Sequence, residues 1–238
     1  NLTATDQTTD TPTNNFATLN PLISYPDKQT QTFSEGNTVV SLTDRDFALS
    51  SIVVANGKWY CEVKYTDESA QDDAMLGIVK MNDSTDWVNH LGVNEYYFGQ
   101  NNGSWGIYES DGNVYHNASN SSYGDSFTED DIIMIALDLD NNKLYFGENG
   151  TWHNSGDPTS GATGTGAVSI DASSEYAIGF SMADSPAGPR TGEMSFNFGN
   201  PAFAISSSQA DDAGYGNFEY DVPTGYYALC TKNLAEYG

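Results

Sequence analysis

The fold is decided by one stretch of the chain, Asp131-Ile-Ile-Met-Ile-Ala-Leu-Asp-Leu-Asp-Asn-Asn-Lys-Leu-Tyr-Phe-Gly-Glu-Asn-Gly150. Its first part, residues 132–139, is an almost unbroken apolar run rich in β-branched residues, which predicts a strand buried on both faces. Asp140-Asn-Asn142 predicts a tight turn, because Asn and Asp tolerate positive φ and hydrogen-bond their own backbone. Residues 143–146 return as the partner strand, and Glu148-Asn-Gly150 predicts a second turn. A hairpin this apolar is not stable alone, so other strands must cover it.

Further strands are predicted on both sides of this hairpin. The clearest is 58–65, where one alternating set should face the core and the other should face outward. The inward set is Trp59, Cys61, Val63 and Tyr65, and the outward set is Tyr60, Glu62 and Lys64. Shorter candidates lie at 30–42, 47–54, 74–80, 96–99, 105–108, 167–170, 176–182, 194–199 and 226–229. No window of useful length shows helical periodicity, so the sequence predicts an all-β sandwich or barrel.

Composition divides the chain into three parts. Residues 1–29 are predicted to form an extended N-terminal arm and a segment pinned to the body by its apolar cluster at 16–23. Residues 30–200 hold the predicted sandwich, and residues 201–238 are predicted to be a C-terminal loop and closing segment. Regions 158–166 and 206–216 are rich in Gly, Ser and Ala, which is typical of long surface loops.

Charge and hydropathy exclude several classes of partner. The chain has 33 acidic and 8 basic residues, a net charge of −25, and such a field repels nucleic acid and anionic membranes. A net charge this negative is typical of a well-solvated surface, or of a protein that works in salty water or alongside calcium. No run of about 18 apolar residues predicts a membrane span. There is no signal peptide and no initiator Met, which suggests processing or excision from a longer protein.

The two cysteines, Cys61 and Cys230, lie far apart in sequence and lack the paired spacing of a zinc site. Cys61 is expected to face the core as a small hydrophobic residue. A disulfide between the two is an open alternative, because sequence does not show proximity.

Taken together, the strand segments resemble the SPRY domain. The elements that carry the resemblance occur in family order over roughly residues 30–200: Gly57-Lys-Trp-Tyr-Cys-Glu-Val63, Leu76-Gly-Ile78, Trp105-Gly-Ile-Tyr108, Asp131-Ile-Ile-Met-Ile-Ala-Leu-Asp138, Leu144-Tyr-Phe-Gly-Glu-Asn-Gly150 and Ser195-Phe-Asn-Phe-Gly199. The chain departs from the family at Cys61, where SPRY strands of this type commonly carry a second Trp. The resemblance implies a bent, two-sheet antiparallel β-sandwich, similar to the concanavalin-type jelly roll, and a binding module without catalysis.

The segments that flank the sandwich resemble the borders of SPRY domains in tailed-phage virion proteins. They are Phe16-Ala-Thr-Leu-Asn-Pro-Leu22 and Pro223-Thr-Gly-Tyr-Tyr-Ala-Leu-Cys-Thr-Lys-Asn-Leu234. This resemblance implies a tail-fibre, head-fibre or decoration protein that is virion-borne or extracellular. It would form homo-oligomers and bind other virion proteins or a host-surface protein or glycan. The alternative is an extracellular, lectin-like carbohydrate-binding module.

Catalytic and metal-binding patterns are weak. Asp138 and Asp140 share a strand face but lie at a turn, without the further carboxylate expected of a glycosidase strand. Asp138, Asp140, Asn141 and Asn142 also offer oxygen ligands for calcium, although turn chemistry uses the same residue types and is the favoured interpretation. The three histidines, His90, His116 and His153, lack the spacing of metal ligands. We therefore expect no enzyme activity and no cofactor.

Aromatic residues in loops are the candidates for a binding surface, since Trp and Tyr supply large contact areas with a polar end. The predicted binding residues are Trp87, His90, Tyr96, Tyr97, Trp152 and His153. For Trp87 and Trp152 the alternative is burial in the core, as is usual for Trp in a small sandwich.

Overall fold

The computed structural model describes residues 11, 13–24, 30–43, 46–68, 73–81, 97–183 and 190–238. Its strands are β1 Thr32–Ser34, β2 Val39–Thr43, β3 Phe47–Leu49, β4 Lys58–Glu68, β5 Ala74–Lys80, β6 Ser104–Tyr108, β7 Val114–His116, β8 Ser119–Ser121, β9 Ile132–Asp138, β10 Lys143–Glu148, β11 Thr151–Trp152, β12 Val168–Ser169, β13 Tyr176–Met182, β14 Thr191–Asn197 and β15 Tyr227–Ala228. Its helical turns are η2 Glu35–Asn37, η3 His153–Ser155 and η4 Pro158–Thr163, and the helix is α2 Thr231–Tyr237.

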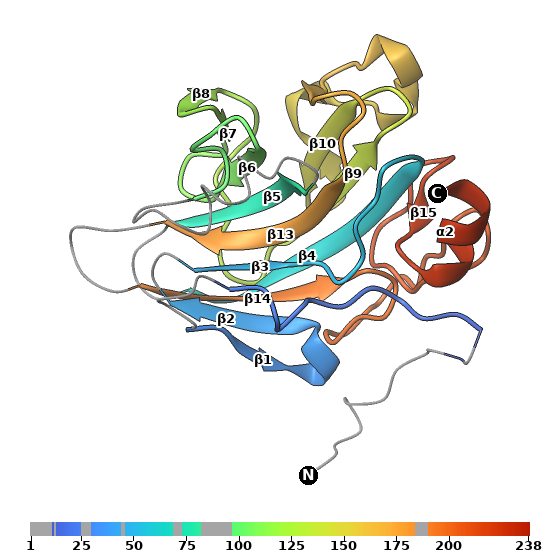
Figure 1. Ribbon diagram of the computed structural model, residues 1–238, viewed down its shortest axis with the longest axis horizontal. Coiled ribbons are helices and arrows are strands. Elements are labelled where there is room, and N and C mark those ends of the chain that lie inside the picture. Colours follow the sequence, from blue (N-terminus) through green and yellow to red (C-terminus); the bar gives the residue numbers. More distant parts are fainter. Residues whose placement is uncertain are drawn as a thin grey trace.

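The strands form two packed sheets, which confirms the predicted all-β sandwich (Figure 1). Within the described residues, the larger sheet has nine strands, in the order β1-β2-β14-β4-β9-β10-β11 with β12 added to β10 and β15 to β4. The smaller sheet has six, in the order β3-β13-β5-β6-β7-β8. Among the described strands, neighbours pair antiparallel except β15, which runs parallel to the start of β4.

The hairpin of β9 and β10 lies where the sequence predicts it. β9 pairs with β4 on one side and with β10 on the other. Ile133, Ile135 and Leu137 point into the core between the sheets, whereas Met134 and Ala136 belong to a second core on the outer face of the larger sheet. Both faces of β9 are therefore buried, which explains why its sequence does not alternate with polar residues.

The turn at the tip of this hairpin is held by its own polar residues. The backbone N–H of Asn141 donates to Oδ1 of Asp138 (2.9 Å), and the side-chain amide of Asn141 donates to Oδ2 (2.8 Å). Lys58 forms an ion pair with the same carboxylate at 2.9 Å, and Asn142 adopts a positive φ of 57°. Asp140 accepts from the backbone N–H of Gly57 at 3.0 Å. These contacts agree with the interpretation of these residues as turn residues.

β4 departs from the expectation for its outward face. Trp59, Cys61 and Val63 lie in the core between the sheets as predicted. However, Tyr60 and Glu62 are both fully buried, so the prediction that they face outward into solvent is wrong. Residues 209–230 cover them, and Phe218, Tyr226 and Ala228 join the second core there.

The two flanks of the sandwich lie side by side (Figure 1). Phe16 pairs with Cys230, the N–H of Ala17 donates to the carbonyl of Leu229 (2.8 Å), and the N–H of Thr231 donates to the carbonyl of Asn15 (3.0 Å). We call this pairing of 15–17 with 229–231 the flank clasp. Residues 201–238, set apart by composition, thus supply β15, one side of the flank clasp and the layer over β4.

Both cysteines are free and buried. Cys61 lies in the core between the sheets and Cys230 lies in the second core, so the larger sheet separates them. The structure therefore does not contain the disulfide that sequence left open.

Several local predictions were wrong. Of the predicted strand 96–99, the described residues 97–99 are not in a strand; 47–54 is a strand only over 47–49, and β7 and β8 were not predicted. A seven-residue helix, α2, ends the chain where no helix was expected.

Among the described residues, no helix is both long and apolar enough to span a membrane.

Candidate interaction surface

Three of the six predicted binding residues, Trp87, His90 and Tyr96, lie outside the described residues. The other three, Tyr97, Trp152 and His153, are described, and the structure does not bring them together. Tyr97 packs on the outer face of the smaller sheet, whereas Trp152 packs on the outer face of the larger sheet. These two side chains therefore lie on opposite sides of the sandwich.

Trp152 is partly buried against the second core. Its ring makes edge-to-face contacts with Tyr60 and Tyr145, each with ring centroids 6.4 Å apart. Aromatic pairs of this geometry contribute to stability beyond their buried area. Much of the Trp152 ring therefore supports the core rather than facing a partner.

His153 begins η3 and turns toward the rim of the β10 hairpin. Its ring contacts Tyr123 edge-to-face at 6.3 Å, and its Nε2 atom lies 3.7 Å from a carboxylate oxygen of Glu148. Burial lowers the pKa of His153, while the charge of Asp125 acts in the opposite direction. Burial raises the pKa of Glu148, with smaller contributions from Asp131 and Asp125. Burial therefore disfavours the charged form of both side chains.

Tyr97 belongs to a group of three partly exposed tyrosines, Tyr97, Tyr108 and Tyr115, which we call the tyrosine cluster. The ring of Tyr115 contacts the other two edge-to-face, at 6.0 Å from Tyr97 and 5.7 Å from Tyr108. The cluster rests on apolar residues of the smaller sheet's outer face, among them Phe98, Met75 and Val79. The three hydroxyl-bearing rings thus form one continuous aromatic surface.

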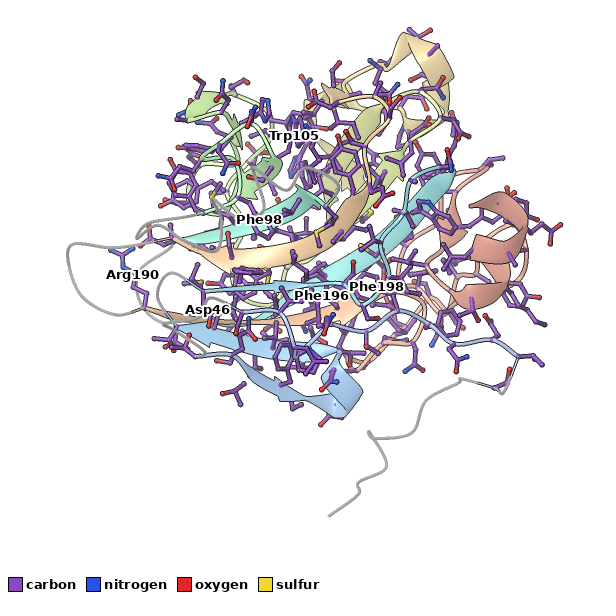
Figure 2. All side chains as sticks on the ribbon, in the orientation of Figure 1. Asp46, Phe98, Trp105, Arg190, Phe196 and Phe198 are labelled. Atoms are coloured by element: carbon purple, nitrogen blue, oxygen red, sulfur yellow. The ribbon has the colours of Figure 1, made fainter. Side chains whose placement is uncertain are left out.

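Carboxylates anchor two of these hydroxyl groups. Tyr108 donates to Oδ1 of Asp73 at 2.9 Å, and Arg190 forms an ion pair with the same carboxylate. Tyr115 donates to Oδ2 of the exposed Asp111 at 3.3 Å. Burial, and then the neighbouring carboxylates, raise the pKa of Tyr108 and Tyr115, so both remain protonated hydrogen-bond donors. Figure 2 shows Arg190 at one end of β14, away from Phe196 and Phe198 toward the other end.

Strand register explains how the cluster forms. Gly106 on β6 faces Tyr115 on β7, and Tyr108 follows two residues later on the same face. A Cβ atom at Gly106 would lie 2.8 Å from the Cβ of Phe98, so glycine is required for this close approach. Tyr108 and Tyr115 were not among the predicted binding residues, because the hairpin of β6 and β7 was not predicted from the sequence. The turn signal Asp111-Gly-Asn113 after a predicted strand could have revealed the hairpin.

The two outer faces differ in the cover that the described residues provide. The outer face of the larger sheet lies beneath the layer of residues 209–230, which contributes the buried Phe218 and Tyr226. The outer face of the smaller sheet carries the partly exposed tyrosine cluster with Asp111 at its rim. Tyrosines are enriched in protein interfaces because a large apolar ring ends in a hydroxyl group. The tyrosine cluster is therefore the candidate interaction surface.

No candidate metal-binding site is found among the described residues. They contain no group of three or more His, Cys, Asp or Glu side chains arranged to hold an ion. His116 stacks on Trp105, with ring centroids 4.1 Å apart, and its Nδ1 lies 2.9 Å from the carbonyl oxygen of Ser104. That histidine is a packing residue.

Comparison with known proteins agrees with this architecture. Residues 58–170 match the model of the SPRY domain family. Over these residues the chain is similar to the SPRY domain family. The SPRY fold serves as a protein–protein binding module, and all three tyrosines of the cluster lie within the matched residues.

Solved structures support the SPRY fold at low sequence identity. The SPRY domain of human HERC1 superimposes with a TM-score of 0.51 and 17% identity, covering 73% of this chain and 96% of the HERC1 domain. Stonustoxin superimposes with a TM-score of 0.50 and 16% identity, covering 76% of this chain and 27% of the toxin chain. Identities this low show the fold alone. A search of curated proteins gives no match.

Proposed function

We propose that this SPRY domain is a non-enzymatic binding module of a tailed-phage virion protein, and that it binds through the tyrosine cluster. The observation that carries the binding role is the aromatic surface of Tyr97, Tyr108 and Tyr115, rimmed by the exposed Asp111. Two rings are fixed by hydrogen bonds to carboxylates, so little side-chain entropy is lost when a partner binds.

The virion assignment rests on the flanks. The two segments that resemble the borders of phage SPRY domains, 16–22 and 223–234, meet in the flank clasp. A module whose entry and exit lie together can be added to a larger protein without disturbing it. The module would then be displayed on the particle as part of a tail fibre, head fibre or decoration protein, and homo-oligomers would form through the arms.

The partner is a virion protein or a host-surface protein with cationic or polar groups at its contact face. The net charge of −25 and the acidic rim at Asp111 favour such a partner electrostatically. The same charge disfavours nucleic acid and anionic membranes.

Two experiments test this proposal. First, mass spectrometry of purified phage particles should detect the chain as a virion component; its absence from particles would refute the virion role. Second, Tyr97→Ala with Tyr115→Ala should abolish co-purification with partner proteins and attachment to host cells. Tyr237→Ala, which alters a partly exposed tyrosine outside the cluster, is the matched control. Unchanged binding by the double variant would refute the tyrosine cluster as the interface.

A further inference from the structure

A cleft of about 290 Å³ opens beside the flank clasp, on the side of the sandwich opposite the tyrosine cluster. Its walls come from the N-terminal segment, from the loop 214–217 and from helix α2. The lining includes Thr11, Asn14, Phe16, Tyr215, Asn217 and Lys232. The volume lies near the lower limit of small-molecule sites, which suits a ligand of one sugar ring.

The loop that forms one wall is held rigidly by Asp211, which is 6% exposed. Its Oδ1 atom accepts from the backbone N–H of Tyr215 (2.8 Å), and its Oδ2 atom accepts from Ala228 N–H (2.9 Å) and from the Asn233 amide (2.7 Å). This one carboxylate thus ties the loop to β15 and to α2. A wall fixed before binding lowers the entropy cost of taking up a ligand.

The opposite wall is fixed by the flank clasp and by Asn14, which is 7% exposed. The Oδ1 atom of Asn14 accepts from the backbone N–H of Lys232 at 3.2 Å. Phe16 packs against Gly199, where an added Cβ would lie 2.3 Å from the ring. Glycine at this position lets the aromatic ring form part of the floor.

The lining combines a few polar groups with apolar surface. The polar lining residues are Thr11, Asn14, Asn217 and Lys232, and the apolar surface comes from Phe16, Tyr215 and three glycines. The Lys232 Nζ atom lies 5.3 Å above the Tyr215 ring, so its position is defined. Amide, hydroxyl and ammonium groups all bond to sugar hydroxyls, while ring and glycine carbons contact the C–H face of a sugar.

The charge of Lys232 and the net charge of the chain together disfavour charged ligands of either sign. Lys232 is the charged residue of the lining and disfavours a bound cation. An anion would have to approach a chain with a net charge of −25, and the N–H of Tyr215 in the loop is already bonded to Asp211. A neutral ligand with several hydroxyl groups is repelled neither by Lys232 nor by the net negative charge of the chain.

We infer that this cleft binds a single neutral hexose or N-acetylhexosamine unit. The inference stands apart from the proposed function, because the cleft lies among the flanks and the tyrosine cluster lies on the smaller sheet. A ligand of about 12 non-hydrogen atoms with ordinary efficiency gives a dissociation constant in about the millimolar range.

The test is titration of the full chain with glucose, galactose, mannose and N-acetylglucosamine, followed by saturation-transfer NMR and calorimetry. At least one sugar should bind. Lys232→Met and Thr11→Val should each weaken binding about tenfold, as expected for loss of one hydrogen bond. Thr11→Trp should fill the cleft and abolish binding. Thr11 and Lys232 are exposed, so these variants should fold normally.

Lys143→Met is the matched control, since Lys143 on β10 donates to the hydroxyl of Ser169 on β12 and does not line the cleft. It should bind sugar like the wild type. The inference is overturned if none of the four sugars binds at about 100 mM, a concentration far above the expected dissociation constant. It is also overturned if the cleft variants bind like the wild type, or if inorganic phosphate or glucuronate binds in place of neutral sugars. Tyr97→Ala with Tyr115→Ala should leave sugar binding intact, so failure of this inference and failure of the proposed function are separable.

Discussion

At the residue scale, Glu62 shows how a carboxylate can be buried on a sheet. It is fully buried and accepts four hydrogen bonds, from the Tyr60 hydroxyl, the Asn197 amide and the backbone N–H groups of Glu219 and Tyr220. Burial raises its pKa, although the four donors oppose that shift. The two backbone donors come from the far end of the chain, so this residue joins the larger sheet to the layer that covers it.

Replacing Glu62 by Gln should lower the free energy of unfolding by about 2–4 kcal/mol, since an NH₂ group would face two donors that then lack an acceptor. Urea denaturation monitored by tryptophan fluorescence measures the change. Glu175→Gln, at an exposed glutamate, should change stability by less than about 0.5 kcal/mol. Equal stability of the two variants would show that the four hydrogen bonds make no net contribution to the free energy of unfolding.

His153 should make the protein less stable in mild acid. Burial lowers its pKa in the folded state below the ordinary value of 6.5. As pH falls through 6.5, the unfolded chain binds the proton more readily than the folded chain, so stability is lost; above that pH the contribution vanishes. Relative to His153→Gln, the wild type should lose stability between pH 8 and pH 5 in urea denaturation. Parallel stability curves for the two proteins would contradict this expectation.

At the element scale, sequence predicted one face of β4 and missed the other. Alternation correctly placed Trp59, Cys61 and Val63 in the core, because the facing sheet selects apolar side chains there. The outer residues Tyr60 and Glu62 look like solvent-facing residues, since each ends in a polar group. Their cover comes from residues about 160 positions later, and no local pattern reports so distant a contact.

The second core predicts a large effect for Phe218→Ala. The ring is fully buried and contacts Tyr60 edge-to-face, with centroids 5.0 Å apart. Its removal should cost about 3–5 kcal/mol, combining lost burial with an unfilled cavity. Phe203→Ala, at a partly exposed ring outside the three core clusters, should cost much less. Thermal denaturation compares them, and a similar loss in both would refute a structural role for the covering layer.

At the scale of the whole molecule, the strong local signals were enough to predict the sandwich. The β9–β10 hairpin, the alternation in β4 and the order of motifs all survive in the structure. The helix α2 was missed because seven residues are too few to show a helical period. The tyrosine cluster was predicted only at Tyr97, because the cluster depends on the pairing of β6 with β7 rather than on a local motif.

Truncation after residue 200 should prevent stable folding, even though the SPRY match ends at residue 170. It would expose Tyr60, Met134, Ala136 and Tyr145, and would remove two of the donors to Glu62. We expect aggregation and loss of the near-ultraviolet circular dichroism signal. Deletion of residues 1–10 removes none of these contacts and serves as the control. A truncated chain with native dichroism and cooperative unfolding would contradict the assignment of residues 201–238 to the folded unit.

The flank clasp also determines how the module would respond to mechanical tension. Asn15 and Thr231 are its outermost paired residues, and their chain ends leave in the same direction from an antiparallel pairing. Force applied between residues 15 and 231 would therefore load the hydrogen bonds of the clasp one at a time. The bonds between Asn15 and Thr231 would break before that of Ala17, and the clasp would yield at low force before the sandwich itself was stretched.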